Sequence, residues 1–153
     1  IKMNNRLNKQ VPPLKSEKPI FYERANIKSM WTYKSENELN GYDGAISKTK
    51  SEMLFAMNEL YKILKQNGIK LSLAVYPWPQ QLENDVVNSK HVKMWRDFCN
   101  EKCFKFIDFF PFFFEEVKKS SYLEVYKKYY FWNDVHFNTK GNKIIADRLI
   151  KEF

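Results

Sequence analysis

The segment at 132–138 (Trp-Asn-Asp-Val-His-Phe-Asn) combines the residue types that catalysis most often uses. It contains one of the two histidines of the chain, His136, and an aspartate two residues earlier, Asp134. Side chains two residues apart in an extended segment leave the same face, so the carboxylate of Asp134 can reach the Nδ1–H of His136. An imidazole held in this way presents Nε2 as a base. We therefore predict that His136 is a general base and that Asp134 orients it.

The same two residues also have a purely structural interpretation. An aspartate or asparagine ahead of a helix is common capping chemistry, and an Asp-x-His pair often arises by chance. The nearby helix N-terminus disfavours the imidazolium form of His136 while Asp134 favours it, so their effects on its pKa oppose each other. Taken alone, the pair is compatible with catalysis and with capping.

Aromatic residues supply the second candidate set. Trp78 lies between two prolines after an apolar run, where it is either a wedge in the core or a wall of a binding site. We take Tyr76, Trp78 and Trp132 as the candidate substrate-binding residues, because aromatic side chains are common in the walls of ligand sites. The other histidine, His91, has no acidic neighbour in register and is expected at the surface.

The elements that position these residues follow from periodicity. We predict a helix with an apolar stripe at 53–64, ended by a left-handed Gly68, and a last helix from Thr139 with Asn138 as its N-cap. The remaining predicted elements are a turn at 40–44, strands at 69–76 and 104–110, and helices at 92–103 and 113–128. This alternation is typical of a parallel sheet covered by helices on both faces, although two strands make an incomplete sheet. Ligands of such sheets bind beyond the carboxyl ends of the strands, where the Asp134–His136 loop is also expected.

Composition limits the function further. The 153 residues suit one domain, and a hydrophobic content of 44% suffices for a core. The net charge of +8 favours polyanions in general, but the lysines are scattered and arginines are few, so we predict no specific nucleic-acid partner. No apolar run approaches the roughly 20 residues of a membrane span.

Cys99 and Cys103 lie four apart in one predicted helix, and we expect two buried thiols rather than a disulfide or a metal site.

Residues 1–30 are polar and interrupted by prolines, and we predict an extended arm or linker there, with the α/β domain in 31–153. The chain opens on Ile1, which suggests a processed or cropped polypeptide. The absence of a targeting segment is therefore uninformative, and both the cytoplasm and the bacterial envelope stay open as compartments. Nothing in the sequence indicates an oligomeric state.

Residues 132–147 (WNDVHFNTKGNKIIAD) resemble the C-terminal block of SGNH/GDSL-type hydrolases, in which an Asp and a His precede an Asn-x-x-Gly helix start. In that likeness Asn138 caps the helix and Gly141 allows it to pack closely on the sheet. The nearest resemblance is to SGNH-like proteins encoded with bacterial surface-polysaccharide genes. Their strand ending in Tyr-Pro-Trp-Pro corresponds to 69–79, and a helix with Trp95 and a strand at 106–108 follow in the same order.

The resemblance covers residues 50–153 and implies a three-layer α/β/α sandwich with a parallel, flavodoxin-like sheet, of which this chain is an incomplete part. It implies a hydrolase or acyltransferase acting on ester-linked acyl groups of a glycan by a Ser-His-Asp mechanism, with no cofactor and no metal. Many family members carry the aspartate three residues before the histidine, where this chain has Asn133. The two-residue spacing resembles the alginate-acetylation branch, so the orienting role passes to Asp134.

The family's nucleophile and oxyanion blocks (Gly-Asp-Ser and Gly-x-Asn-Asp) are absent from the chain, and none of its nine serines follows an aspartate. The resemblance therefore places the serine N-terminal to these residues, and we expect the segment alone to be inactive. The alternative is a non-catalytic SGNH-like module that binds acidic polysaccharide or a partner protein. That alternative keeps the fold and needs no missing nucleophile.

Overall fold

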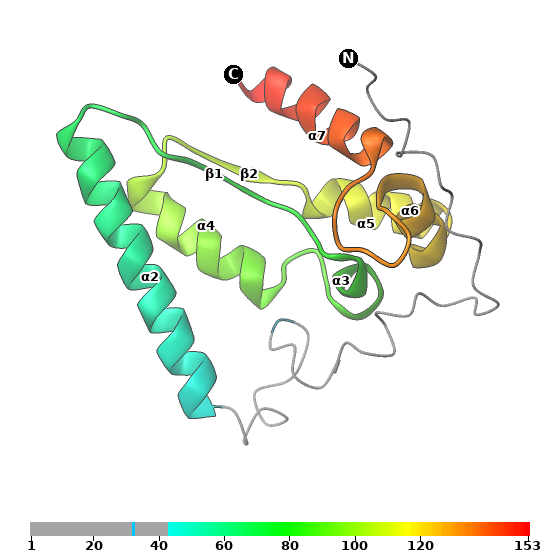
Figure 1. Cartoon of the computed structure of the whole chain (residues 1–153), viewed down its shortest axis with the longest axis horizontal. Coiled ribbons are helices and arrows are strands. Elements are labelled where there is room, and N and C mark those ends of the chain that lie inside the picture. The colour runs from blue at the N-terminus through cyan, green and yellow to red at the C-terminus, as the bar shows by residue number, and fades with distance from the viewer. Residues whose placement is uncertain (1–31, 33–42) are drawn as a thin grey trace, which may run out of the picture.

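The computed structural model describes Thr32 and residues 43–153, a helix-rich α/β arrangement around a short parallel sheet (Figure 1). In chain order its elements are α2 (Asp43–Gln66), β1 (Ser72–Val75), α3 (Pro79–Asn84), α4 (Lys90–Lys102), β2 (Lys105–Asp108), α5 (Phe110–Lys119), α6 (Tyr122–Tyr129) and α7 (Thr139–Glu152). The predicted arm at 1–30 lies outside the described residues, as do the first three residues of the predicted turn at 40–44.

The two strands pair in parallel, with Ser72 opposite Lys105 and Val75 opposite Asp108. Helix α4 makes the crossover between them, and it lies on the opposite side of the strands from α7 (Figure 1). The predicted α/β class with a parallel sheet is confirmed. Among the described residues the sheet has only these two strands.

The apolar side chains form two cores, and β2 contributes to both. One core lies between α2, β1 and α4 and is built on Val92, Trp95 and Phe98, with Phe106 of β2 packed against it. The other joins β2 to α5, α6 and α7, and its buried members are Leu82, Ile107, Phe109, Phe113, Val125, Tyr126, Tyr129, Tyr130 and Phe137. Successive β2 residues therefore face different cores, as a strand covered on both sides requires.

Several predicted boundaries are wrong for local reasons. Helix α2 begins at Asp43, within the predicted turn, ten residues before the predicted apolar stripe at 53–64. The predicted helix at 113–128 is two helices, because the hydroxyl of Ser120 bonds the Glu116 carbonyl at 3.0 Å and Ser121 caps α6 through the amide of Glu124 at 3.2 Å. Helix α3 was not predicted, since Pro79 reads as a strand terminator although proline is also favoured in a first helical turn.

The prediction of two buried thiols is also wrong. Cys99 and Cys103 form a disulfide that links the last turn of α4 to the residue following it, across a Cα–Cα distance of 4.5 Å. One turn of helix brings residues i and i+4 together, so a four-residue spacing is compatible with a local disulfide.

Candidate functional site

The predicted catalytic loop connects α6 to α7 and is closed at its base by backbone hydrogen bonds. Tyr130 and Phe137 form an isolated antiparallel bridge. The amide of Phe131 donates to the carbonyl of His136 at 3.0 Å, and the amide of Asn138 donates to that of Tyr129 at 2.9 Å. These contacts fix where the loop leaves α6 and where it enters α7.

Asn138 holds both helix ends with one side chain. Its Oδ1 accepts from the amides of Lys140 and Gly141, at 2.9 and 3.1 Å, which makes it the predicted N-cap of α7. Its Nδ2 donates to the carbonyls of Lys128 and Tyr130, at 3.1 and 3.0 Å, at the end of α6. The four bonds use both acceptor and donor atoms of the amide, so no other side chain of similar size satisfies the position.

Gly141 is buried, but its close packing is against α6 rather than against the sheet as expected. A Cβ at this position would overlap the carbonyl oxygen of Tyr129 and come within 2.7 Å of the Phe137 ring. The first turn of α7 therefore approaches the end of α6 more closely than any side chain allows.

Tyr126 of α6 is hydrogen-bonded to the backbone of the loop. The residue is fully buried, and its hydroxyl accepts from the amide of Asp134 at 3.0 Å and lies 3.0 Å from the carbonyls of Phe131 and Asp134. Burial raises the pKa of this hydroxyl to about 12, so it stays protonated and can donate to either carbonyl. Asn133 has a φ of 62°, a left-handed conformation that asparagine tolerates, and it turns the chain toward Asp134.

Asp134 and His136 are in contact. The Nδ1 of His136 lies 2.6 Å from Oδ1 of Asp134, which confirms the predicted hydrogen bond. The segment between them is bent rather than extended: Oδ1 of Asp134 also accepts from the amides of Val135 and His136, at 2.6 and 3.2 Å. The hydrogen bond from the His136 ring is the main reason that the pKa of Asp134 lies below its ordinary value. Asp134 thus turns the backbone and holds the imidazole ring, while the cap of α7 is Asn138 rather than Asp134.

The histidine is open to solvent, and its other ring nitrogen, Nε2, forms no hydrogen bond within the part of the chain that the structure describes. The His136 side chain is 77% exposed and the Asp134 side chain 48%. With Nδ1 as donor to the carboxylate, the tautomer leaves the lone pair of Nε2 accessible. No hydrogen bond joins His136 to a serine among residues 43–153, where Ser89, Ser120 and Ser121 are occupied at helix ends.

Tyr76 lies beside the loop, as its place at the carboxyl end of β1 predicts. Its ring centroid is 4.8 Å from that of Phe137, the residue after His136. Below this contact the buried hydroxyl of Tyr130 donates to the carbonyl of Pro77 at 2.7 Å. Two contacts therefore join the exit of β1 to the loop, although these segments are more than fifty residues apart.

Trp78 lies at a hollow beside β1 and not at the loop. It is 46% exposed and, with Tyr76, borders a hollow of about 280 Å³ whose other lining residues are Met57, Leu73, Ala74, Val75, His91 and Trp95. His91 is thus half-buried rather than at the surface, edge-on to Phe110 at 6.1 Å, and burial lowers its pKa. His136 does not border this hollow. The sequence signal for His91 is its place on α4 one turn before Trp95, on the face that packs inward.

Trp132 does not join Tyr76 and Trp78. Its ring packs on that of Tyr126 at 5.3 Å, with the ammonium of Lys127 at 5.7 Å. These contacts brace the loop against α6. Trp132 therefore does not line the hollow that Tyr76 and Trp78 border, and substrate binding by the three residues stays a prediction.

Asp108 is a further carboxylate at the sheet rim. It ends β2, accepts from the amide of Phe110 at 3.0 Å and pairs with Arg96 at 3.0 Å. Burial raises its pKa, and the amide and the guanidinium partly offset that effect. One oxygen of Asp108 therefore binds the first amide of α5 and the other binds Arg96 of α4, so the carboxylate has a structural role.

Lysines near α5 and α6 are largely paired with glutamates. Glu116 accepts from Lys119, Lys128 and the hydroxyl of Tyr129, at 3.3, 2.9 and 2.9 Å. Lys118 pairs with Glu115 and Lys127 with Glu124 in the same two helices. The positive charge is therefore distributed among local pairs here and does not form a free anion-binding patch.

Within the described residues, no group of three or more His, Cys, Asp or Glu side chains is close enough to hold a metal ion. None of the described helices has the length and apolar character needed to cross a membrane. Comparisons of the chain with protein-family models, curated proteins and solved structures find no match.

Proposed function

We propose that this chain supplies the histidine and aspartate of a Ser-His-Asp hydrolase or acyltransferase of the SGNH type, acting on acyl esters of a glycan. The observation that supports the proposal most strongly is the 2.6 Å contact between Nδ1 of His136 and Oδ1 of Asp134, together with the accessible Nε2. The proposal includes a complete α/β/α sandwich and a serine located outside residues 43–153.

The chemistry follows from the free lone pair of Nε2. His136 takes the Oγ proton of the serine as that oxygen attacks the acyl carbonyl carbon, and Asp134 stabilises the imidazolium formed. The tetrahedral intermediate then expels the sugar oxygen, which receives the proton from His136. Water or a second hydroxyl, deprotonated by the same imidazole, releases the acyl group from the serine. Backbone or side-chain donors for the oxyanion must come from the unit that carries the serine.

The alternative function is a binding module that uses the same fold without catalysis. Two observations favour it: Trp78 is exposed beside the hollow at β1, and no serine of residues 43–153 is hydrogen-bonded to His136. The paired state of the α5–α6 lysines is against an acidic polysaccharide bound at that surface.

The test is hydrolysis of acetyl esters on a polysaccharide by the complete natural polypeptide. We expect His136→Ala to reduce kcat by about 10³-fold or more, and Asp134→Asn to reduce it strongly as well, because the imidazole loses its orienting acceptor. His91→Ala is the matched control, since it removes the other histidine and should leave activity within a few-fold. Wild-type activity in a folded His136→Ala variant would refute the proposal, and steeply salt-dependent polyanion binding without any hydrolysis would favour the alternative.

A further inference from the structure

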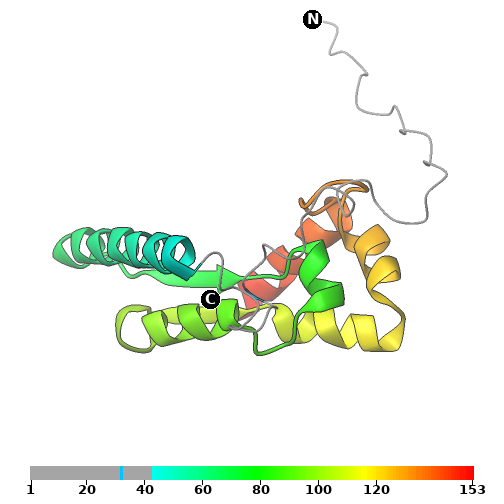
Figure 2. The same ribbon diagram turned by 90° about the horizontal axis from the view of Figure 1, so that it is seen from below.

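Helices α2 and α4 border a groove that lies apart from the candidate catalytic loop. The two helices lie side by side in the view from below (Figure 2), and residues of both line the groove. Its volume of about 480 Å³ is within the roughly 300–1,000 Å³ of small-molecule pockets. Neither His136 nor any other residue of the loop at 130–138 is among the described residues that line it. The groove is therefore a second candidate site.

Apolar side chains form the floor of this groove, and lysines lie at its ends. Residues at intervals of four line it on each helix, namely Lys50 and Leu54 of α2 and Lys90, Met94, Phe98 and Lys102 of α4. Residues at this spacing share one side of a helix, so on α4 a lysine lies at each end of the row. Phe98 is buried, and Leu54 and Met94 are partly buried against the core that α2 shares with α4. The groove thus combines apolar contact area with separated cations.

The charge of the groove is positive. Four lysines line it, including Lys93, against a single carboxylate among the described lining residues, that of Asp97. Within the part of the chain that the structure describes, neither Lys93 nor Lys102 is paired with a carboxylate, and the Lys102 ammonium lies 5.1 Å from the centre of the Phe98 ring. The lysines of α5 and α6, by contrast, pair with glutamates. Two ammonium groups of the groove are therefore available to an anionic ligand.

The residue types in the groove favour an acidic glycan over a nucleic acid. No arginine is among the described lining residues, and lysine lacks the bidentate geometry that suits phosphates and base edges. The aromatic ring of the lining, that of Phe98, is buried and presents no open face on which a base could stack. A chain of uronate sugars carries single carboxylates at intervals, and each of them can pair with one ammonium group. The C–H groups between these carboxylates can cover the apolar floor.

We propose that the groove between α2 and α4 binds an acidic polysaccharide through the carboxylates of its uronate residues. Lys93 and Lys102 pair with these carboxylates, and the C–H surface of the sugar chain covers Leu54 and Met94. This assigns a place to the acidic polysaccharide that the alternative function would bind. Because the groove is separate from the His136 loop, the proposal stands or falls independently of catalysis.

Titration of the complete natural polypeptide with fluorescently labelled oligogalacturonate, a chain of uronate residues, tests this proposal. We expect saturable binding that added salt weakens, and no binding of a neutral dextran oligosaccharide of equal length. Replacing both Lys93 and Lys102 with glutamine should weaken binding about tenfold, because each exposed charge pair contributes up to about fivefold.

The matched control is the double replacement of Lys118 and Lys127 with glutamine, which removes the same charge from α5 and α6. It should change the affinity by less than about twofold, since these lysines already pair with glutamates. Equal weakening by the two double variants would overturn the proposal, because the overall charge alone would then attract the glycan. No binding of oligogalacturonate would also overturn it, as would tighter binding of single-stranded DNA of equal charge.

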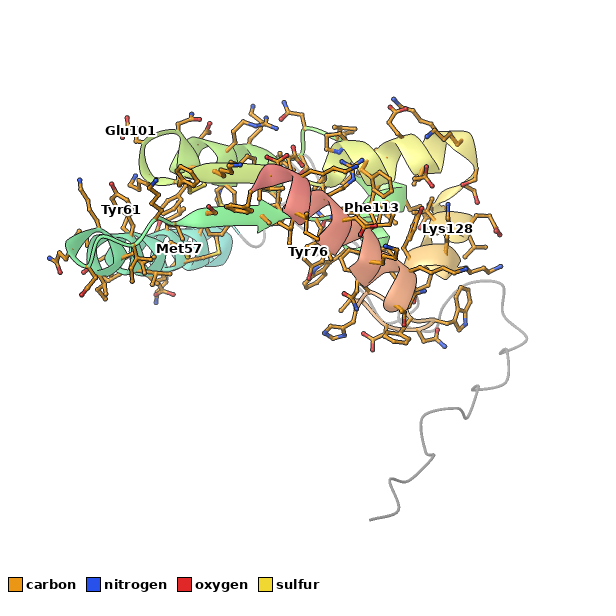
Figure 3. All side chains as sticks on the ribbon, turned by 90° about the horizontal axis from the view of Figure 1, so that it is seen from above. Met57, Tyr61, Tyr76, Glu101, Phe113 and Lys128 are labelled. Atoms are coloured by element: carbon orange, nitrogen blue, oxygen red, sulfur yellow. A yellow bond between two sulfur atoms is a disulfide. The ribbon has the colours of Figure 1, made fainter. Side chains whose placement is uncertain are left out.

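Asp97 gives a second test with the opposite sign. Its carboxylate lines the groove, so Asp97→Asn should strengthen the binding of oligogalacturonate about threefold by removing a like charge. Glu101→Gln is the matched control, because Glu101 belongs to the same helix and lies on its side away from α2 (Figure 3). The control should leave the affinity within about twofold. Weaker binding by a folded Asp97→Asn variant, or an equal gain in both variants, would contradict the proposed site.

Discussion

Asn138 offers the sharpest quantitative prediction, because its amide makes four hydrogen bonds with separable roles. Replacing it with alanine removes the N-cap of α7, which costs about 1 kcal/mol. The same change leaves the carbonyls of Lys128 and Tyr130 without their donors. The first is exposed and regains water, while the second is partly buried, so these bonds add roughly 0.5 and 1 kcal/mol. We expect Asn138→Ala to cost about 2.5 kcal/mol of unfolding free energy.

Two further substitutions at Asn138 separate the contribution of the N-cap from that of the two donor hydrogen bonds. Asn138→Ser keeps a capping oxygen and loses only the two donors, so about 1.5 kcal/mol should be lost. Asn138→Asp keeps the cap but turns a carboxylate toward two carbonyl oxygens, so the loss should exceed that of serine and become smaller as acid protonates the carboxyl group. Ser121→Ala is the control, because Ser121 caps α6 with a single bond and should cost about 1 kcal/mol.

The assay is urea unfolding followed by far-UV circular dichroism, with the free energies taken at unchanged slope. If Asn138→Ala costs no more than Ser121→Ala, the donor bonds contribute nothing. The view that one side chain fixes the entry and exit of the His136 loop would then be refuted.

Three other expectations follow from single contacts. Gly141→Ala places a methyl group against the Tyr129 carbonyl, a backbone atom that cannot move alone, and should cost about 3 kcal/mol in the same unfolding assay. Reducing the Cys99–Cys103 disulfide should cost about 2 kcal/mol, the value for a loop this short, and Cys103→Ser should make stability insensitive to reductant. Hydrogen bonds from Lys128 and Tyr129 lower the pKa of Glu116 from 4.5 to about 2. Its contribution to stability is therefore complete above pH 4.5 and lost as the pH falls toward 2, and a pH titration of Glu116→Gln should lack that component.

The sequence predicted those parts of the fold that depend on neighbouring residues. The cap at Asn138, the left-handed Gly68 with its φ of 69° and the Asp134–His136 contact all follow from spacing and residue type. The parallel pairing of β1 and β2 follows from the alternation of elements. The Asp134–His136 contact was predicted on the assumption that the segment is extended, whereas the chain bends at Asp134.

Features that depend on distant partners were beyond sequence reasoning. Nothing in the sequence indicates that the ring of Trp132 packs on that of Tyr126 from the preceding helix, and its predicted contact with substrate stays a prediction. Gly141 was expected to pack on the sheet, whereas the end of α6 is the surface that it approaches. His91 received a surface position because nothing in the sequence indicates that the β1 hollow lies beside it.

The central proposal is that His136, oriented by Asp134, activates a serine. A fluorophosphonate probe, which reacts with activated serines, tests it most directly in the complete natural polypeptide. We predict that one serine outside residues 43–153 is labelled, that His136→Ala abolishes the labelling and that His91→Ala preserves it. No labelling of the wild-type protein, or equal labelling in the His136→Ala variant, would contradict the proposed role of the pair.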